Sequence, residues 1–243
     1  MPARVRIDRL LVERGLFESR AKAQAAIAAG LVTADDVPVT RPAAEIAADA
    51  VLRAEPAHPW VSRGGVKLAA ALDHFRFDPK GRVGLDVGAS TGGFSEVLLA
   101  RGARRVYAVD VGHGQLHPKL RTRPQLLSLE RTDIRSLSPA LLPEPPDAIV
   151  IDVSFVSLKV VLPAALALAR GPAWLVALVK PQFEAGRRAA KKGVVRDPQI
   201  HAAVCDEVAG FVAARGWGVV GILPSPILGR DGNREFLIGA ARD

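Results

Sequence analysis

The chain has 243 residues, of which 49% are hydrophobic and 24% are charged. This apolar content excludes a mostly disordered chain, and the length fits one main domain plus a small module. Lys and Arg number 33 against 25 Asp and Glu, and the resulting net charge of +8 indicates a polyanionic partner. The single cysteine, Cys205, excludes a disulfide framework and any multi-cysteine metal site, so we expect a reducing compartment, the cytosol.

Neither an export signal nor a membrane span is expected. Charged residues interrupt the apolar stretch at residues 1–15, which therefore lacks the apolar run of a signal peptide. The longest apolar segments, 160–169 and 174–179, are well short of the ~20 residues that a spanning helix requires.

The first 55 residues predict a compact α+β module. Helices are expected at 7–14 and 20–29, each closed by a glycine, and Ser19 is the expected N-cap of the second. Short β-type segments follow at 31–33, 37–39 and 51–53. Two prolines then indicate a stiff linker at 56–61.

The composition changes after residue 61 to an alternating β/α pattern. Strands are expected near 83–87, 105–109, 126–129, 148–151, 174–179, 219–223 and 235–240, with helices near 65–75, 93–101, 157–169 and 199–215. Such alternation predicts a Rossmann-like, doubly wound and mostly parallel sheet with ligands at the carboxyl ends of its strands. A loop alone joins the last two strands, so we expect them to form an antiparallel hairpin, which a dehydrogenase-type sheet does not usually have.

A glycine-rich loop follows the first of these strands, with the sequence Gly88-Ala89-Ser90-Thr91-Gly92-Gly93. Glycines permit a tight turn, and the next helix offers unpaired N–H groups to an anionic group. Asp110 lies 22 residues after Gly88 at the end of the next strand, where an acid can accept hydrogen bonds from a ribose diol. Asp86 would repel a pyrophosphate but suits a cofactor ammonium, which favours S-adenosylmethionine. A purely structural turn is the alternative.

Four charged residues occupy positions that can converge at one sheet edge. Asp152 and Lys180 each end an apolar strand, where a charge is costly unless it is solvated or paired. Lys67 precedes the first strand of the sheet and Glu235 opens the last. Because that edge lines the crevice of an open α/β sheet, the four residues predict an active site. Two ordinary salt bridges are the alternative.

The motifs that make the sequence recognisable are VSRGGVKL, DVGASTGGF, IDVSF, LVKPQFE, GVVRD and SPILGRDGNREFL. With them the chain resembles, over essentially its whole length, the TlyA family, once called haemolysins and known as cytidine 2′-O-methyltransferases of ribosomal RNA. The resemblance implies an RNA-binding domain like that of ribosomal protein S-four at 1–55, a linker at 56–61 and an FtsJ-like methyltransferase domain at 62–243.

The resemblance also implies roles for individual residues. In FtsJ-like enzymes a Lys-Asp-Lys-Glu tetrad marks 2′-O transfer, and the matching positions here are Lys67, Asp152, Lys180 and Glu235. The cofactor, S-adenosylmethionine, is then expected to contact Asp86, the loop 88–93, Asp110, Asp133 and Asp152. Asp133 stands where the family commonly has Asn, and its carboxylate can still accept from the adenine amino group. No metal is required.

The chemistry expected of this tetrad is deprotonation. A ribose 2′-hydroxyl is a poor nucleophile, so the enzyme must orient it and remove its proton. Lys180 is the candidate neutral amine for that step, with Asp152 and Glu235 holding the two lysine heads in place. A charged Lys180 that stabilises an alkoxide would use the same residues, so both roles stay open.

Residues 1–30 hold six basic and three acidic side chains, which favours phosphate contacts on one face of the first two helices. On charge alone a solvated helix surface is the better interpretation, and the family resemblance reverses it. The expected RNA contacts are Arg4, Arg6, Arg14, Arg20 and Lys22, joined by Arg63, Arg187 and Arg188 of the second domain. We expect ribosomal RNA or ribosomal subunits as partners and a monomeric protein.

Three other functions remain as alternatives: an inactive RNA-binding or ribosome-assembly protein on the same fold, a membrane-active haemolysin, and a nicotinamide-dependent reductase. Missing apolar spans weigh against the haemolysin, and the intact tetrad weighs against the inactive protein. His113 and His117 are four residues apart but lack an evident third ligand, so no metal site is expected. Cys205 lies in an apolar helix pattern and is expected in the core.

Overall fold

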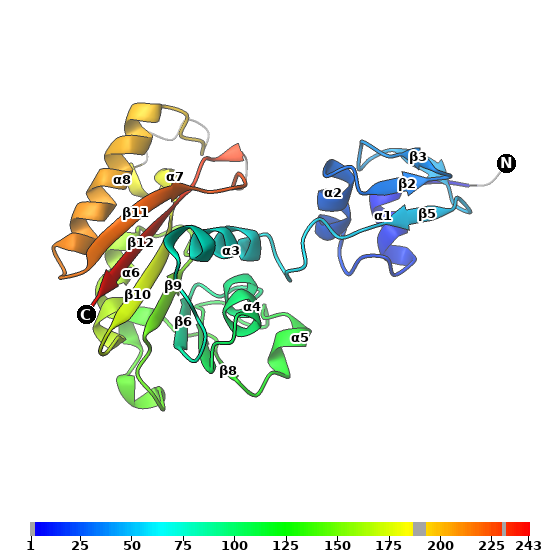
Figure 1. Ribbon diagram of the computed structural model, residues 1–243. Coiled ribbons are helices and arrows are strands. Elements are labelled where there is room, and N and C mark those ends of the chain that lie inside the picture. Colours follow the sequence, from blue (N-terminus) through cyan, green and yellow to red (C-terminus); the bar gives the residue numbers. More distant parts are fainter. Residues whose placement is uncertain (1–2, 187–192, 230–231) are drawn as a thin grey trace. The chain divides into compact units, whose positions relative to one another are not determined.

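The computed structural model describes residues 3–186, 193–229 and 232–243. It divides the chain into two compact units, Met1–Pro59 and Trp60–Asp243 (Figure 1). Each unit has hydrophobic clusters of its own. Trp60 and Val61, the last two residues of the predicted linker, pack within the second unit, where Val61 is buried.

The first unit combines two helices with two small antiparallel sheets. Its elements are β1 (Arg4–Arg6), α1 (Ile7–Glu13), α2 (Arg20–Ala28), β2 (Val32–Ala34), β3 (Val37–Pro38), β4 (Glu45–Ala47) and β5 (Leu52–Ala54). β1 pairs with β4, and β2 lies between β3 and β5. Buried apolar residues of both helices, among them Leu11 and Ile27, form the core with β2. The two helices and the segments of β2, β3 and β5 were expected, whereas β1 and β4 were not, because these two strands form only by pairing with each other across a long stretch of chain.

The second unit is an α/β fold around one seven-stranded sheet. Its elements are α3 (Gly64–Phe75), β6 (Val83–Val87), α4 (Gly93–Ala100), β7 (Arg105–Val109), α5 (Pro118–Arg121), β8 (Leu126–Leu129), two 3₁₀ turns (Ile134–Ser136 and Pro139–Leu141), β9 (Ala148–Ile151), α6 (Leu158–Leu168), β10 (Ala173–Val179), α7 (Pro181–Glu184), α8 (Pro198–Ala213), β11 (Gly218–Pro224) and β12 (Phe236–Arg242). The strand order is β11-β12-β10-β9-β6-β7-β8.

All pairings in this sheet are parallel except those of β12, which is antiparallel to both β10 and β11. The predicted doubly wound sheet with an antiparallel last strand is therefore confirmed. The chain runs from β6 outward to β8 on one side and continues with β9 on the other. The strand order thus reverses between β6 and β9, and ligands of open α/β sheets bind at such a point.

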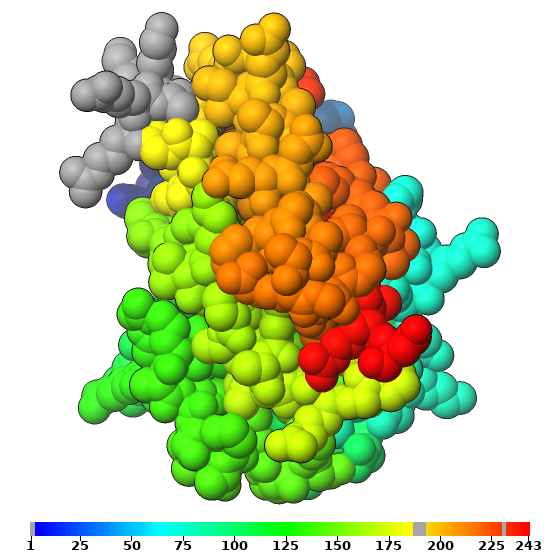
Figure 2. All heavy atoms as spheres, turned by 90° about the vertical axis from the view of Figure 1, so that its left-hand side faces the viewer, coloured from blue at the N-terminus to red at the C-terminus, as the bar shows by residue number. Residues whose placement is uncertain are grey.

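Helices cover both faces of the sheet. Side chains of β10 alternate between two buried clusters, with Val176 facing α3 and α4 and Ala177 facing α6 and α8. Figure 2 shows the face on which α8, coloured yellow to orange, is exposed. Among the helices that the structure describes, none is both long enough and apolar enough to cross a membrane.

Candidate active site

The loop between β6 and α4 forms one wall of the site. Gly88 has φ = +82°, and a Cβ at this position would lie 2.4 Å from the backbone oxygen of Asp152. Only glycine therefore allows the loop to approach the end of β9 so closely. Gly93 begins α4 against Ser62, whose Oγ would be 2.1 Å from an added Cβ. Both glycines are therefore required for close packing of the loop, in addition to their position beside the site.

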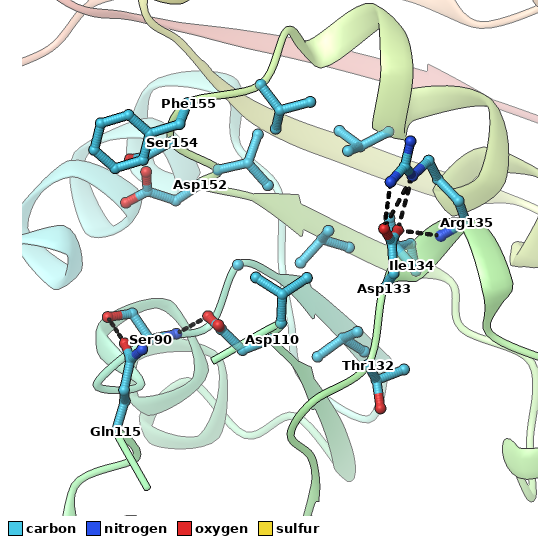
Figure 3. Close-up of a pocket in the computed structure, with 17 residues that line it drawn as sticks. Ser90, Asp110, Gln115, Thr132, Asp133, Ile134, Arg135, Asp152, Ser154 and Phe155 are labelled. Carbon is cyan, nitrogen blue, oxygen red and sulfur yellow. Dashed lines mark hydrogen bonds and ion pairs between the residues drawn. The ribbon is translucent and has the colours of Figure 1, made fainter. Parts of the chain in front are cut away.

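Asp110 ends β7 and ties two loops together. One carboxylate oxygen accepts from the backbone N–H of Ser90 at 2.7 Å (Figure 3), and the other accepts from that of Gly112 at 2.7 Å. Ser90 also donates through its hydroxyl to Gln115. Each oxygen of Asp110 retains a further lone pair, so the residue can hold the loops and still accept from a diol.

The loops after β6, β7, β8 and β9 enclose a cavity of about 640 Å³, within the usual range for small-molecule sites. Figure 3 shows its carboxylates on different sides, with Asp110 and Ser90 opposite Asp152 and Phe155. Of the predicted cofactor residues, those lining this cavity are Gly88, Ser90, Asp110, Asp133 and Asp152.

Asp133 contributes a carboxylate held by its neighbour. Both of its oxygens accept from the Arg135 guanidinium, and Oδ1 also accepts from the Arg135 backbone N–H at 2.9 Å. The Arg135 hydrogen bonds lower the pKa of Asp133 to about 2, so the group is ionised at any physiological pH. An ionised carboxylate is a pure acceptor, which suits an amino group as partner.

Two predicted cofactor residues lie behind the cavity wall. The carboxylate of Asp86 is fully buried and accepts from the backbone N–H and the hydroxyl of Ser95, at 2.9 and 2.7 Å, so it joins β6 to the first turn of α4. Burial raises its pKa to about 7. Gly92 is packed against Leu116 and Leu120 instead of facing the cavity. In this structure both residues shape the loop from behind.

A second cavity, of about 390 Å³, adjoins the first, because Gly88, Ser90, Asp152 and Ser154 line both. Three of the four predicted tetrad residues lie on its wall: Lys67 from α3, Asp152 after β9 and Lys180 after β10. Ala89, Thr91 and Gly93 of the glycine loop also border it. The structure thus brings the lysines and the glycine loop to one place.

The tetrad forms two nearly buried ion pairs. Lys67 Nζ lies 2.5 Å from Glu235 Oε2, and Lys180 Nζ lies 2.6 Å from Asp152 Oδ1. Lys180 also donates to Ser154 Oγ at 2.8 Å. Lys67, Lys180 and Glu235 are each less than 10% exposed. Such charges remain in a protein interior when each has a partner, as here.

These contacts determine what Lys180 can do. The carboxylate of Asp152 and the hydroxyl of Ser154 occupy two positions around Nζ. A neutral amine so held keeps its lone pair, and an ammonium keeps at least one N–H, for a group in the cavity. The same geometry therefore serves a proton acceptor or an electrostatic contact to an alkoxide.

Sequence reasoning missed Ser154 and Phe155, although both belong to the motif IDVSF directly after β9. Phe155 has φ = +66° and is 86% exposed on the wall of the larger cavity, with its ring centroid 5.2 Å from that of Phe183. A large aromatic side chain in the left-handed region and open to solvent is uncommon. Their position directly after the end of β9 was an available signal, because such positions border ligand sites. A single sequence, however, does not show whether a phenylalanine ring is exposed or belongs to the core.

Glu184 was also missed. It accepts from Ser157 Oγ at 2.5 Å and from the Leu158 backbone N–H at 2.7 Å, and so connects α7, which follows β10, to the start of α6. The loops that carry Lys180 and Asp152 are thereby joined at a second point.

The side chains predicted to contact RNA differ in whether they are already bonded to groups of the protein itself. Arg4 donates to the Glu45 carbonyl, Arg14 to the carbonyls of Ala48 and Ala50, and Lys22 pairs with Glu18. The Arg14 guanidinium therefore holds the first unit together. Arg63 is exposed and borders the smaller cavity. Arg6 and Arg20 share a single carboxylate. Arg187 and Arg188 lie outside the described residues.

The two histidines considered as metal ligands do not form a cluster. His113 Nδ1 lies 2.9 Å from Glu130 Oε2 in an exposed pair. Within the described part of the chain, no group of three or more His, Cys, Asp or Glu side chains could hold a metal ion. Cys205 is buried in α8, and burial raises the pKa of its thiol to about 11.

Fold and site together define a class: a Rossmann-like methyltransferase with the antiparallel strand β12, a glycine loop after β6 and an acid after β7. Comparison with known proteins agrees. Residues 60–242 match the FtsJ-like methyltransferase family, and residues 5–52 match the S4 domain, a small RNA-binding domain. The chain belongs to the FtsJ-like methyltransferases and, among them, to the TlyA family.

Individual relatives support this assignment. The chain is 46% identical to a putative rRNA methyltransferase, YqxC, of Bacillus subtilis over 96% of its own length and 84% of the relative's. It is 45% identical to the 16S/23S rRNA (cytidine-2′-O)-methyltransferase TlyA of Mycobacterium tuberculosis over 98% of this chain and 90% of that one. A solved structure of a putative hemolysin from Streptococcus thermophilus is 40% identical, covers 100% of this chain and 89% of that one, and superposes with a TM-score of 0.78.

Proposed function

We propose that this protein transfers a methyl group from S-adenosylmethionine to the ribose 2′-hydroxyl of a cytidine in ribosomal RNA. The observation that carries the proposal is the pair of adjoining cavities. One has the size and acceptors for a nucleoside-containing cofactor, and the other presents two buried lysine–carboxylate pairs. The relative from Mycobacterium tuberculosis is named for the same reaction.

The residues of the larger cavity fit S-adenosylmethionine. Asp110 would accept from the ribose hydroxyls, and Asp133 would accept from the adenine amino group. Ionised carboxylates on the walls suit a ligand that carries a sulfonium and an ammonium. Oδ1 of Asp86, buried behind the glycine loop, has no hydrogen-bond partner among the residues that the structure describes. When bound, the cofactor supplies a methyl group that is already activated for transfer.

The chain's own contribution is to place and deprotonate the hydroxyl. Lys180, in its neutral form, accepts the 2′-hydroxyl proton on the lone pair of Nζ and becomes an ammonium paired with Asp152, while Asp152 and Ser154 hold the amine toward the smaller cavity. Lys67, fixed by Glu235, lies on the same wall and provides a positive group near the developing alkoxide. Most of these side chains are buried, so the groups are positioned before the substrate arrives.

The substrate nucleotide would approach over Phe155, whose exposed ring offers a stacking face for a base turned out of the RNA. Arg63, exposed beside the smaller cavity, can contact a neighbouring phosphate. The S4 domain would bind RNA elsewhere on the same ribosomal subunit. Ribosomal substrates place the reaction in the cytosol.

The test is transfer of a labelled methyl group to purified small and large ribosomal subunits, followed by mapping of the modified nucleotide. We expect ribose methylation of a cytidine that Lys67→Ala abolishes. Lys159→Ala is the matched control, because Lys159 lines neither cavity and forms an ion pair with Glu207. Normal cofactor binding without transfer to either subunit would contradict the proposal and favour a ribosome-assembly role.

A further inference from the structure

Asp8, on the first turn of α1, is a buried carboxylate in the first unit that the catalytic proposal does not use. Its side chain is 0% exposed, yet it accepts four hydrogen bonds. Oδ1 accepts from Arg6 Nε at 3.1 Å. Oδ2 accepts from Arg6 Nη2 at 3.0 Å, Arg20 Nη2 at 2.8 Å and Gln24 Nε2 at 2.8 Å.

This carboxylate keeps two like charges together. The guanidiniums of Arg6 and Arg20 both lie within 3.0 Å of one oxygen and would repel each other without it. The hydrogen bond from Arg6, assisted by those from Arg20 and Gln24, holds the pKa of Asp8 far below its usual range. The anion is therefore present at every physiological pH, and the cluster has a net charge of +1.

The two guanidiniums are only partly used by this contact. Arg6 gives Asp8 two of its five N–H groups and Arg20 gives one. Their side chains are 40% and 47% exposed, and the described residues include no further acceptor for them. By contrast, both terminal nitrogens of Arg14 are spent on backbone carbonyls. Arg6 and Arg20 thus offer outward N–H groups in a fixed arrangement.

We propose that Asp8 is a positioning residue that holds Arg6 and Arg20 as a two-arginine clamp for a backbone phosphate of the RNA substrate. Paired guanidinium edges match phosphate oxygens, whereas a single mobile lysine acts as a point charge. The S4 domain match over residues 5–52 favours RNA over an acidic protein as the source of the anion. The inference rests on the proposed function, because it assumes an RNA substrate.

Asp8→Asn separates positioning from simple electrostatics. Removal of one negative charge from a basic surface should tighten binding to RNA if only net charge mattered. If Asp8 positions the clamp, the variant should instead bind about tenfold more weakly. The slope of log affinity against log salt concentration should also fall by about one. Fluorescence anisotropy of the full chain with a labelled fragment of ribosomal RNA measures both quantities.

Glu13→Gln is the matched control, because Glu13 is an exposed residue of the same helix and the substitution changes the charge equally. It should bind at least as tightly as the wild type. If Asp8→Asn and Glu13→Gln bind equally well, the positioning role is wrong. Hydrogen exchange of the α1 and α2 amides shows whether Asp8→Asn leaves the first unit folded.

A second pair of variants decides the matter even if Asp8→Asn unfolds that unit. Arg20→Lys keeps the charge at a half-exposed site but loses the planar fork, and should weaken RNA binding several-fold. Arg9→Lys, at an exposed position of α1, should have little effect. Equal affinities for these two variants would overturn the clamp. Methyl transfer is measured separately, so RNA binding without transfer would count against the proposed reaction and not against the clamp.

Discussion

Lys180 has two partners that fix its amine, Asp152 and Ser154, and this makes its chemical role testable. If it accepts the proton, Lys180→Ala should abolish transfer while cofactor and RNA affinity stay nearly intact. Lys180→Arg should be almost as inactive, because a guanidinium remains protonated at any working pH. Single-turnover assays measure this step, because release of the product RNA cannot mask it.

The same assay distinguishes the electrostatic alternative. Proton acceptance predicts that the rate rises with pH until the amine is mostly neutral and then levels off. If Lys180 acts only as an electrostatic contact, the rate should not rise with pH in this way. The arginine variant should then retain substantial activity. A Lys180→Arg rate within a few-fold of the wild type would therefore remove the proton-acceptor role.

Asp86 predicts a pH dependence of stability. Burial raises its pKa from about 4 to about 7, so the folded protein retains a proton that the unfolded chain releases across this range. The contribution of Asp86 is fully present below pH 4 and is lost as the pH rises through 7. Within this window the free energy of unfolding should decrease by about 1.4 kcal/mol per pH unit.

Asp86→Asn should remove this dependence, because an amide does not titrate and can still accept from Ser95. Urea unfolding from pH 4 to pH 8 without cofactor measures it as the difference between variant and wild type. Groups whose pKa is lowered, such as Asp133, change the stability of variant and wild type equally, so their effect cancels in the difference. Their effect on stability also falls at lower pH. A difference that stays constant across the window would show that Asp86 is ionised throughout.

At the scale of elements, apolar strands between turn signals were predictable, whereas β1, β4 and the four-residue helices were not. The bounds of β6, β7, β8 and β9 agree with the sequence patterns to the residue, since each is a short apolar run between turn signals. α5 and α7 have four residues each and begin with proline, which a single sequence presents as a loop. Their packing makes them helical, α5 against β8 and α7 against α8, and no local pattern records that.

The candidate site shows the same division. Residues at strand ends, such as Asp110 and Lys180, were predictable because topology alone brings strand ends together. Asp86 directly precedes Val87 and Gly88, which line the larger cavity, but its own side chain points to α4. Alternate residues of a strand point to opposite sides, so one residue decides the direction. Whether Arg14 contacts RNA or the carbonyls of its own domain depends on a chain segment more than 30 residues away.

The loop between β6 and α4 gives the prediction for this scale. Gly88→Ala would place a methyl group 2.4 Å from the Asp152 carbonyl, at a φ of +82° that alanine adopts only with strain. We expect a loss of about 1–3 kcal/mol in stability and a greater loss of cofactor affinity, because Asp152 borders both cavities. Calorimetry with S-adenosylmethionine and thermal unfolding measure the two effects.

Gly210→Ala is the control for this substitution. Gly210 lies within α8, and among the described residues no atom outside its own stretch of helix lies within 4 Å of an added Cβ, so alanine there should stabilise the helix slightly and leave cofactor binding unchanged. If Gly88→Ala binds the cofactor as well as Gly210→Ala does, the close approach of loop and strand is not needed for the site.

At the scale of the whole molecule, the division between Pro59 and Trp60 suggests where the chain can be cut. Trp60 packs on Gly65, where an added Cβ would lie 2.4 Å from the indole. Val61 is buried and donates its N–H to Glu96 at 2.5 Å. Trp60 therefore supports α3, the helix that carries Lys67, while Val61 ties the chain to α4, the helix after the glycine loop.

A fragment of residues 60–243 should accordingly fold and bind S-adenosylmethionine within a few-fold of the full chain, because every cavity residue and the support of α3 are retained. It should fail to methylate ribosomal subunits, since the S4 domain is removed. A fragment that begins at residue 65 lacks the Trp60 and Val61 contacts and should bind the cofactor more weakly. Calorimetry and methyl transfer to subunits are measured on both fragments. Full transfer by residues 60–243 would show that the first unit is dispensable for substrate recognition. Equal cofactor affinity of the two fragments would show that Trp60 and Val61 do not support the site.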